Sequence, residues 1–149
     1  MNHKTILSDS EKSRLVDAIK RVEETTIAEI KIHIDNHCKE DVLVKAATVF
    51  TKLGMDKTSN KTGVLIYVAC QDRKMAILAD SAIHQKVKAN YWDDLVAQCI
   101  NYMKQGKYAD GLIHVLHTIE KDLSSHFPSA IQSENPNEIS NDLSFGEDE

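Results

Sequence analysis

The chain has few of the residues that build phosphate-binding loops and disulfide frameworks. It contains five glycines, two prolines and three cysteines in 149 residues. The cysteines are odd in number and far apart, without a C-x-x-C pair, which is typical of reduced and mostly buried thiols; they are Cys38, Cys70 and Cys99. No glycine-rich phosphate loop and no G-x-S-x-G nucleophile motif occur. These absences disfavour the common nucleotide-binding and serine-hydrolase classes.

Long apolar runs and an excess of basic charge are also missing. No stretch approaches the roughly 18 apolar residues of a membrane span, and Met1 to Thr5 leads into a polar helix rather than an apolar leader. We therefore expect a cytoplasmic protein with no membrane segment. Residues 1–128 hold all 18 basic residues and 17 of the 23 acids, a balance that argues against nucleic acid as a partner.

The acidic residues at the end of the chain suggest how it is organised. Residues 129–149 carry six acids, no Lys or Arg, and few large apolar residues. Such a composition predicts a mobile tail, for which Phe145 is the candidate anchoring contact. Residues 1–128 are long enough for a single domain with one core.

The strongest structural signal lies between Thr58 and Asp80. Residues 64–70 are continuously apolar and rich in β-branched residues, which predicts a strand covered by helices on both faces. A polar turn at 71–74 and a second apolar stretch at 75–79 extend it into a hairpin. These two strands are expected to be the centre of the fold.

A third strand is predicted at residues 29–35. Its three isoleucines alternate with polar residues, so one face is apolar and the other carries Lys31 and His33. We interpret His33 as an ordinary strand residue rather than a metal ligand.

Helices are predicted on both sides of these strands. A capping box formed by Ser8 and Glu11 places the first helix start at Asp9. The other helices are predicted from apolar residues at helical spacing, and Gly54 and Gly106 mark the ends of two of them. These helices cover residues 42–53, a short turn within 81–88, 91–103 and 108–125. The predicted element order is αβαββααα.

The connections between these elements set the topology of the sheet. Strand 29–35, its following helix and strand 64–70 form a βαβ unit with a right-handed crossover, so the two strands are parallel. The hairpin adds strand 75–79 antiparallel. The predicted fold class is therefore α/β, a small mixed sheet sandwiched between helices.

This topology gathers oxygen-bearing side chains at one edge of the sheet. The two parallel strands begin there and the antiparallel strand ends there, which brings together Glu29, Asp56, Ser59, Asn60, Thr62 and Asp80. Calcium accepts such irregular oxygen ligands, completed by carbonyls and water, and other divalent cations are alternatives. Lys61 would repel a cation or point into solvent. Asp93 and Asp94, at the next helix start, are further candidate ligands.

Two simpler explanations compete with metal ligands in this chain. Glu29 and Asp80 could cap turns while Asp56 solvates a helix end. His114, His117 and Glu120 have a spacing that can hold a metal on one helix face, but no third His or Cys ligand follows them at zinc-like spacing. Surface histidines are the favoured interpretation there.

In order and spacing, several segments together resemble TPM-domain proteins. The resemblance covers about residues 7 to 128 and is carried by ETTIAEI at 24–30, KTGVLIYVA at 61–69, ILAD at 77–80, WD at 92–93, K-x-G-x-Y-x-D-G-L at 104–112 and HFP at 126–128. Glu29 and Asp80 match the acidic positions of the family. The family's Asp-Asn-Gly is Lys61-Thr62-Gly63 here, and a family glycine is Ala82.

The resemblance implies a function as well as a fold. It implies a small mixed sheet between helices with an acidic metal site, reported as calcium in similar proteins. Some relatives are assigned acid phosphatase activity, many have a signal peptide and a membrane helix, and plant members act in photosystem repair. The short bacterial members are the ones that this chain resembles.

Two functions from different classes follow as hypotheses. The first is a cytoplasmic, calcium-binding accessory or interaction module, and the alternative is a metal-dependent acid phosphatase. A phosphatase needs a nucleophile or an activated water together with charge-stabilising groups, and although Lys61 could act as a clamp, no nucleophile is evident. We favour the first. The sequence names neither a substrate nor a protein partner.

Overall fold

The computed structural model of the chain describes residues 2–126 and 140–147. The elements in chain order are α1 (Asp9–Thr25), β1 (Glu29–Asp35), α2 (Val42–Lys52), the 3-10 helix η1 (Met55–Lys57), β2 (Gly63–Ala69), β3 (Lys74–Ala79), α3 (Ser81–His84), α4 (Tyr91–Lys104), α5 (Tyr108–His126) and β4 (Ser144–Phe145). The predicted order αβαββααα is confirmed, with η1 and β4 as additions.

The sheet has four strands in the order β3-β2-β1-β4. β1 and β2 are parallel, with Glu29 opposite Gly63, and β3 is antiparallel to β2. Both orientations were predicted. β4 pairs with the other edge of β1, also in parallel, with Ser144 opposite His33.

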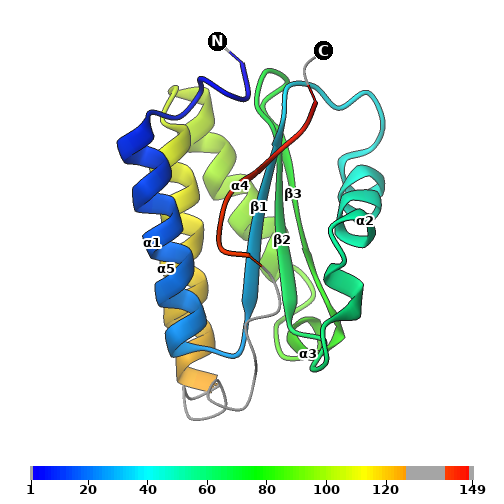
Figure 1. The fold of residues 1–149 in the computed structure, drawn as a ribbon. Helices are drawn as coiled ribbons and strands as arrows, with labels where there is room; N and C mark the ends of the chain where they lie inside the picture. The colour runs from blue at the N-terminus through cyan, green and yellow to red at the C-terminus, as the bar shows by residue number, and fades with distance from the viewer. Residues whose placement is uncertain (1, 127–139, 148–149) are drawn as a thin grey trace.

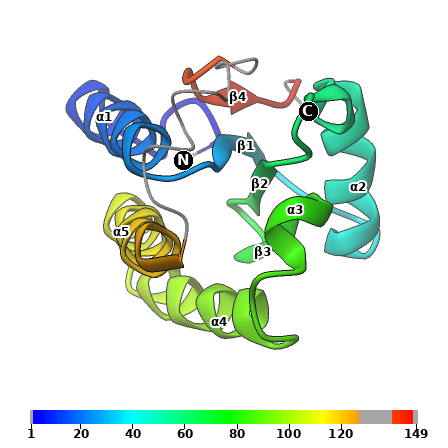
Figure 2. The same cartoon turned by 90° about the horizontal axis from the view of Figure 1, so that it is seen from below.

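Helices cover both faces of this sheet. In Figures 1 and 2, α1, α4 and α5 lie on one side of the strands and α2 lies on the other. The isoleucines of β1 and alternate residues of β2 belong to the larger core with α1, α4 and α5. On the opposite face, Leu65 and Tyr67 of β2 belong to a smaller core with Phe50 of α2. The predicted sandwich is confirmed.

Local sequence accounts for several helix ends. The capping box at α1 is complete, because Ser8 Oγ accepts from Glu11 N at 3.1 Å and Glu11 Oε1 accepts from Ser8 N at 2.8 Å. The chain leaves α2 through Gly54, whose φ of 75° lies in the left-handed region that glycine adopts without strain. Gly106 has φ 76° and stands between α4 and α5 in the same way.

The end of the chain lies partly outside the described residues, so the division into a domain and a mobile tail stays a prediction. The predicted helix end at Phe127-Pro128 is also outside them. Residues 140–147, which we call the tail segment, do pack on the domain through β4. Phe145 contacts the larger core, as the candidate anchor should. Among the described helices, none is long and apolar enough to cross a membrane.

Candidate functional site

The predicted oxygen-rich edge lies at the end of the sheet near α3 (Figure 1). Glu29 N donates to Thr62 O at 3.0 Å, and Asp80 N donates to Gly63 O at 2.8 Å. Glu29 also stands opposite Gly63 in the β1–β2 register. Glu29, Gly63 and Asp80 therefore form one row across three neighbouring strands, and residues in such a row share a face of the sheet.

The middle of this row carries no side chain, because it is Gly63. A Cβ added there would lie 3.4 Å from the carbonyl oxygen of Met55 and 3.5 Å from Phe50 Cζ. A backbone carbonyl of η1 thus lies over the centre of the row, between the positions of the two acids. Glu29 is completely buried, whereas Asp80 is partly exposed.

Asp80 also caps a helix, which was the simpler interpretation of this residue in the sequence. Its Oδ1 accepts from Ser81 N at 2.7 Å and caps α3. The capping interpretation is therefore correct for one of its oxygens. A carboxylate has further lone pairs, so the cap does not by itself prevent metal binding.

The other predicted ligands are less well placed. Asp56 and Asn60 are exposed, while Thr62 is buried with its carbonyl engaged by Glu29 N. Lys61 Nζ donates to the carbonyl of Asp56 at 2.9 Å, which holds an ammonium group within the loop. Asp93 is exposed in the first turn of α4.

These residues fit a divalent cation only in part. Within the described residues, no group of three or more His, Cys, Asp or Glu side chains is placed to hold a metal ion. An ion at the Glu29–Asp80 row would need backbone carbonyls and water to complete its shell, which calcium accepts and zinc sites rarely use.

Two of the three residues with this spacing on α5, His114 and Glu120, contact neighbouring helices. His114 Nε2 lies 2.5 Å from Gln98 Oε1 of α4, and Glu120 Oε2 lies 3.9 Å from Arg21 Nε of α1. His117 is exposed. Their contacts agree with the surface interpretation of this spacing.

Sequence reasoning missed a polar network on β1. His33 is only 8% exposed, and its ring stacks on Tyr67 with centroids 5.9 Å apart. His33 Nε2 lies 3.0 Å from Asp35 Oδ1, and Tyr67 OH donates to Asp35 Oδ2 at 2.6 Å. The alternation in residues 29–35 had shown that this face is polar; what it could not show is that the tail segment covers it.

This network favours the ionised form of Asp35 and the neutral form of Tyr67. Burial raises the pKa of Asp35, but hydrogen bonds from His33 and Tyr67 lower it by more, so the net pKa lies below its usual value. Burial and the bond to Asp35 raise the pKa of Tyr67. Asp35 is therefore an acceptor carboxylate at neutral pH, which makes His33 Nε2 a donor.

A buried carboxylate near the start of β1 was also missed. Glu23 of α1 is 4% exposed, and its Oε2 accepts from Ile30 N at 2.9 Å. Burial, with a smaller effect of the charge of Glu29, raises the pKa of Glu23 to about 7 against the opposing effects of the Ile30 N–H and Lys31. The sequence offered no signal for this, because Glu23 is followed by the exposed Glu24 in a polar helix.

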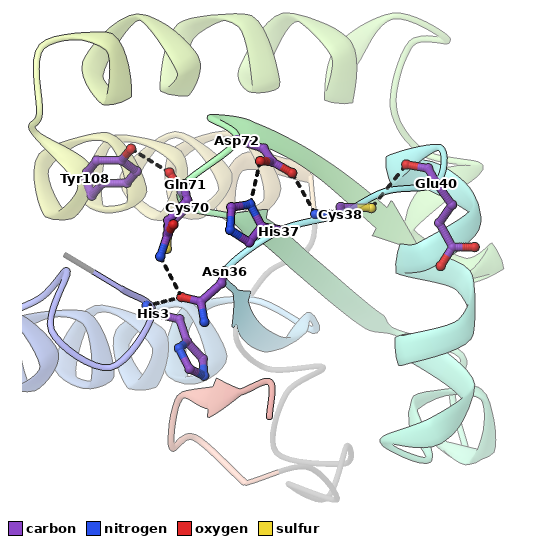
Figure 3. A network of polar contacts seen from close by, with 9 residues as sticks. All are labelled: His3, Asn36, His37, Cys38, Glu40, Cys70, Gln71, Asp72 and Tyr108. Carbon is purple, nitrogen blue, oxygen red and sulfur yellow. Dashed lines mark hydrogen bonds and ion pairs between the residues drawn. The ribbon is translucent and has the colours of Figure 1, made fainter. Parts of the chain in front are cut away.

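A second polar cluster lies at the opposite end of the sheet (Figure 3). Asp72 accepts from Cys38 N at 2.8 Å and lies 2.8 Å from His37 Nδ1. The Cys38 thiol donates to Glu40 O at 3.2 Å. Burial raises the pKa of Cys70, and that of Cys99 to about 12. All three cysteines are free and buried, as predicted.

Comparison with known proteins places this fold in a family. The family model for the TPM domain matches residues 1–122. No match was found among curated proteins. The BA42 protein from the psychrophilic bacterium Bizionia argentinensis is 33% identical, with a TM-score of 0.84 and coverage of 94% of this chain and 95% of that one.

More distant solved structures show the fold alone. The N-terminal domain of a P. gingivalis protein is 12% identical with a TM-score of 0.72, covering 83% of this chain and 80% of that one. The N-terminal domain of the cg2496 protein from Corynebacterium glutamicum is 13% identical with a TM-score of 0.64, covering 80% and 75%. Together with the family match over most of its length, the chain's own topology leads to one assignment: it belongs to the TPM domain family.

Proposed function

We propose that this TPM domain is a divalent-cation-binding module, that calcium is its ion, and that it acts as an accessory or interaction module rather than as a hydrolase. The observation that carries the proposal is the row of Glu29, Gly63 and Asp80. It has an acid at each end, no side chain in the middle, and the Met55 carbonyl over that middle.

The spacing of the row suits an ion larger than magnesium. Neighbouring strands lie about 4.8 Å apart, so the backbones that carry Glu29 and Asp80 are roughly 10 Å apart, and their carboxylates would have to reach toward each other over Gly63 to share an ion. Calcium binds carboxylate and carbonyl oxygens at about 2.4 Å in irregular geometry, whereas magnesium needs a near-ideal octahedron. Asp56, Asn60 and Thr62 in the adjoining loop are the additional oxygen donors, and Asp93 is an outer candidate.

Lys61 limits the affinity of this site. Its ammonium group is held in the loop by the Asp56 carbonyl, close to the proposed ion. Like charges repel, so we expect binding weaker than in a relative with Asp at this position. The row offers carboxylates and a carbonyl but no serine, threonine, cysteine or histidine that could act as the nucleophile, which is why we place the phosphatase alternative second.

Calcium titration of the chelator-stripped protein tests the proposal. At about 100 times the dissociation constant, binding to the folded state alone adds roughly 2.7 kcal/mol to the free energy of unfolding, or roughly 5 to 10 °C in melting temperature. Asp80→Asn keeps an oxygen that can cap α3 but removes the charge, so it should lose most of that rise.

A matched control separates this effect from a change in net charge. Asp17→Asn removes an exposed acid from α1 and should respond to calcium like the parent. A full calcium response in Asp80→Asn would show that the ion does not bind at this row, and Asp93 and Asp94 would be tested next.

A further inference from the structure

The tail segment lies along the edge of β1 that does not pair with β2, and we call the surface that it contacts there the groove. Figure 2 shows β4 beside β1, on the side away from β2. The paired strand is two residues long, Ser144 and Phe145, opposite His33 and Ile34. So short a ladder holds an extended segment weakly, and the side chains around it must supply the rest of the recognition.

Two histidines contact the tail segment. His33 Nδ1 lies 2.8 Å from Ser144 Oγ. Since His33 Nε2 donates to Asp35, Nδ1 of the neutral ring accepts a hydrogen bond from the Ser144 hydroxyl group. His3, which is fully buried, places Nε2 2.6 Å from the carbonyl oxygen of Gly146. Each histidine therefore contacts one particular residue of the tail segment, His33 the side chain of Ser144 and His3 the backbone of Gly146.

The aromatic ring of Phe145 has its own partners. It meets the His3 ring in an edge-on arrangement with centroids 6.2 Å apart. Lys12 Nζ lies 5.4 Å from its centroid, within the range of a cation–π contact. Phe145 also packs against the larger core. The groove therefore selects an aromatic residue after the hydroxyl residue.

The next position requires glycine. Gly146 N donates to Ile34 O at 2.9 Å, and a Cβ on Gly146 would collide with Asp35 Oδ1. Asp35 cannot move aside easily, because both of its oxygens are held, one by His33 and the other by Tyr67. Any side chain at this position must push the segment off β1.

The start of the tail segment is held through its backbone. Lys31 is a buried residue of β1, and its Nζ donates to Asp142 O at 2.7 Å and to Ser140 O at 3.3 Å. Carbonyl contacts do not depend on the side chains of the bound segment. The groove thus requires an extended backbone first, then a hydroxyl residue, an aromatic residue and glycine.

We propose that the β1 edge is a strand-acceptor groove for an extended segment of another protein with the sequence hydroxyl–aromatic–glycine, and that the tail segment is its intramolecular competitor. None of the contacts above needs the tail to be covalently joined to the domain. Being joined gives it an effective concentration on the order of 1 mM, so it hides the groove from weak ligands. A partner enters when its segment binds better or when the tail is released.

The test uses the full chain with its own tail displaced. Gly146→Ala should release the tail segment while leaving every residue of the groove intact. The probe is a synthetic peptide with the sequence of residues 140–147 and an N-terminal fluorophore, followed by fluorescence anisotropy. Gly146→Ala should bind this peptide at least tenfold more tightly than the parent does. Glu147→Ala, which changes an exposed neighbour, should behave like the parent.

Control peptides test the specificity of the groove. Peptides with alanine in place of the phenylalanine or the glycine should bind Gly146→Ala at least tenfold more weakly. Phe145→Ala is a second displaced variant that keeps the glycine, and it should bind the unchanged peptide in the same way if Gly146→Ala is poorly folded.

Several results would overturn the proposal. The groove is not an acceptor if neither displaced variant binds the peptide more tightly than the parent. Its specificity is wrong if the alanine peptides bind equally well. Concentration-dependent dimers of the parent in size-exclusion chromatography that Gly146→Ala abolishes would identify the tail of a second copy, rather than another protein, as the occupant.

Discussion

Replacing Glu23 by Gln should change how the stability of the fold depends on pH. Glu23 Oε2 accepts from Ile30 N, while Oε1 is buried without a hydrogen-bond partner among the described residues. Burial raises the pKa of this carboxyl to about 7 from an unfolded value near 4.5. The folded chain therefore binds a proton that the unfolded chain has already lost between these two pH values.

The sign and size of the effect follow from this difference. Between pH 4.5 and 7 the folded state holds more protons, so its stability falls as the pH rises. The contribution is complete below pH 4.5 and lost once the pH passes about 7. A shift of roughly 2.5 units at 1.36 kcal/mol per unit gives up to about 3 kcal/mol, or roughly 10 °C for a chain of this length.

Thermal melts of the parent and Glu23→Gln at pH 5 and pH 8 measure it. Glutamine cannot ionise, and its carbonyl oxygen can still accept from Ile30 N. Its advantage over the parent should therefore be larger at pH 8 than at pH 5, by up to about 3 kcal/mol. Glu24→Gln removes the exposed neighbouring charge and should leave the pH profile of the parent unchanged. If Glu23→Gln and the parent give parallel profiles, Glu23 is not a protonated buried acid.

Three further predictions concern the tail segment and the row at the sheet edge. Phe145→Ala should lower the melting temperature by several degrees, roughly 1 to 2 kcal/mol for a partly buried ring, as followed by circular dichroism; no change would mean that the ring adds nothing to stability. Lys61→Asp should tighten calcium binding about fivefold in calorimetry, because it replaces a repelling charge by an attracting one. In addition, Asp tolerates the left-handed φ of 59° at position 61 better than Lys does. Unchanged affinity would place the ion away from this loop. An aryl phosphate should show no metal-dependent turnover with calcium, magnesium or manganese, and robust turnover lost in Asp80→Asn would instead support the phosphatase alternative.

Local signals were sufficient for most of the fold. The capping box before α1 and the alternating isoleucines of β1 are short sequence patterns that each predict an element without reference to distant residues. The right-handed crossover rule then predicts the parallel pairing of β1 and β2. The row of Glu29, Gly63 and Asp80 follows from that pairing. For the same reason, the position of this row at one end of the strands could be predicted from the sequence alone.

Features that depend on distant packing could not be predicted. β4 is two residues long within an acidic stretch, too short for any periodicity, and Phe145 was its single apolar cue. The burial of Glu23 depends on how the end of α1 approaches β1. The role of His33 depends on the tail segment, which lies 111 positions further along the chain at Ser144. Periodicity shows which face of β1 is polar but not what covers it.

If calcium binds at Glu29 as we propose, its binding should be coupled to proton release from Glu23. The charge of Glu29 raises the pKa of Glu23. A cation bound at Glu29 would offset that charge and lower the pKa of Glu23. With the pKa of Glu23 raised to about 7, binding at pH 7 should release a fraction of a proton, and the number released should fall as the pH rises to 8.

Calorimetric titrations at pH 7 in two buffers of different ionisation enthalpy count the released protons. The parent and Glu24→Gln should release similar numbers, whereas Glu23→Gln should release almost none while still binding calcium. Equal release from Glu23→Gln and the parent would mean that another group loses the proton. The ion would then be electrostatically independent of Glu23, which argues against Glu29 as one of its ligands, since the charge of Glu29 acts on the pKa of Glu23.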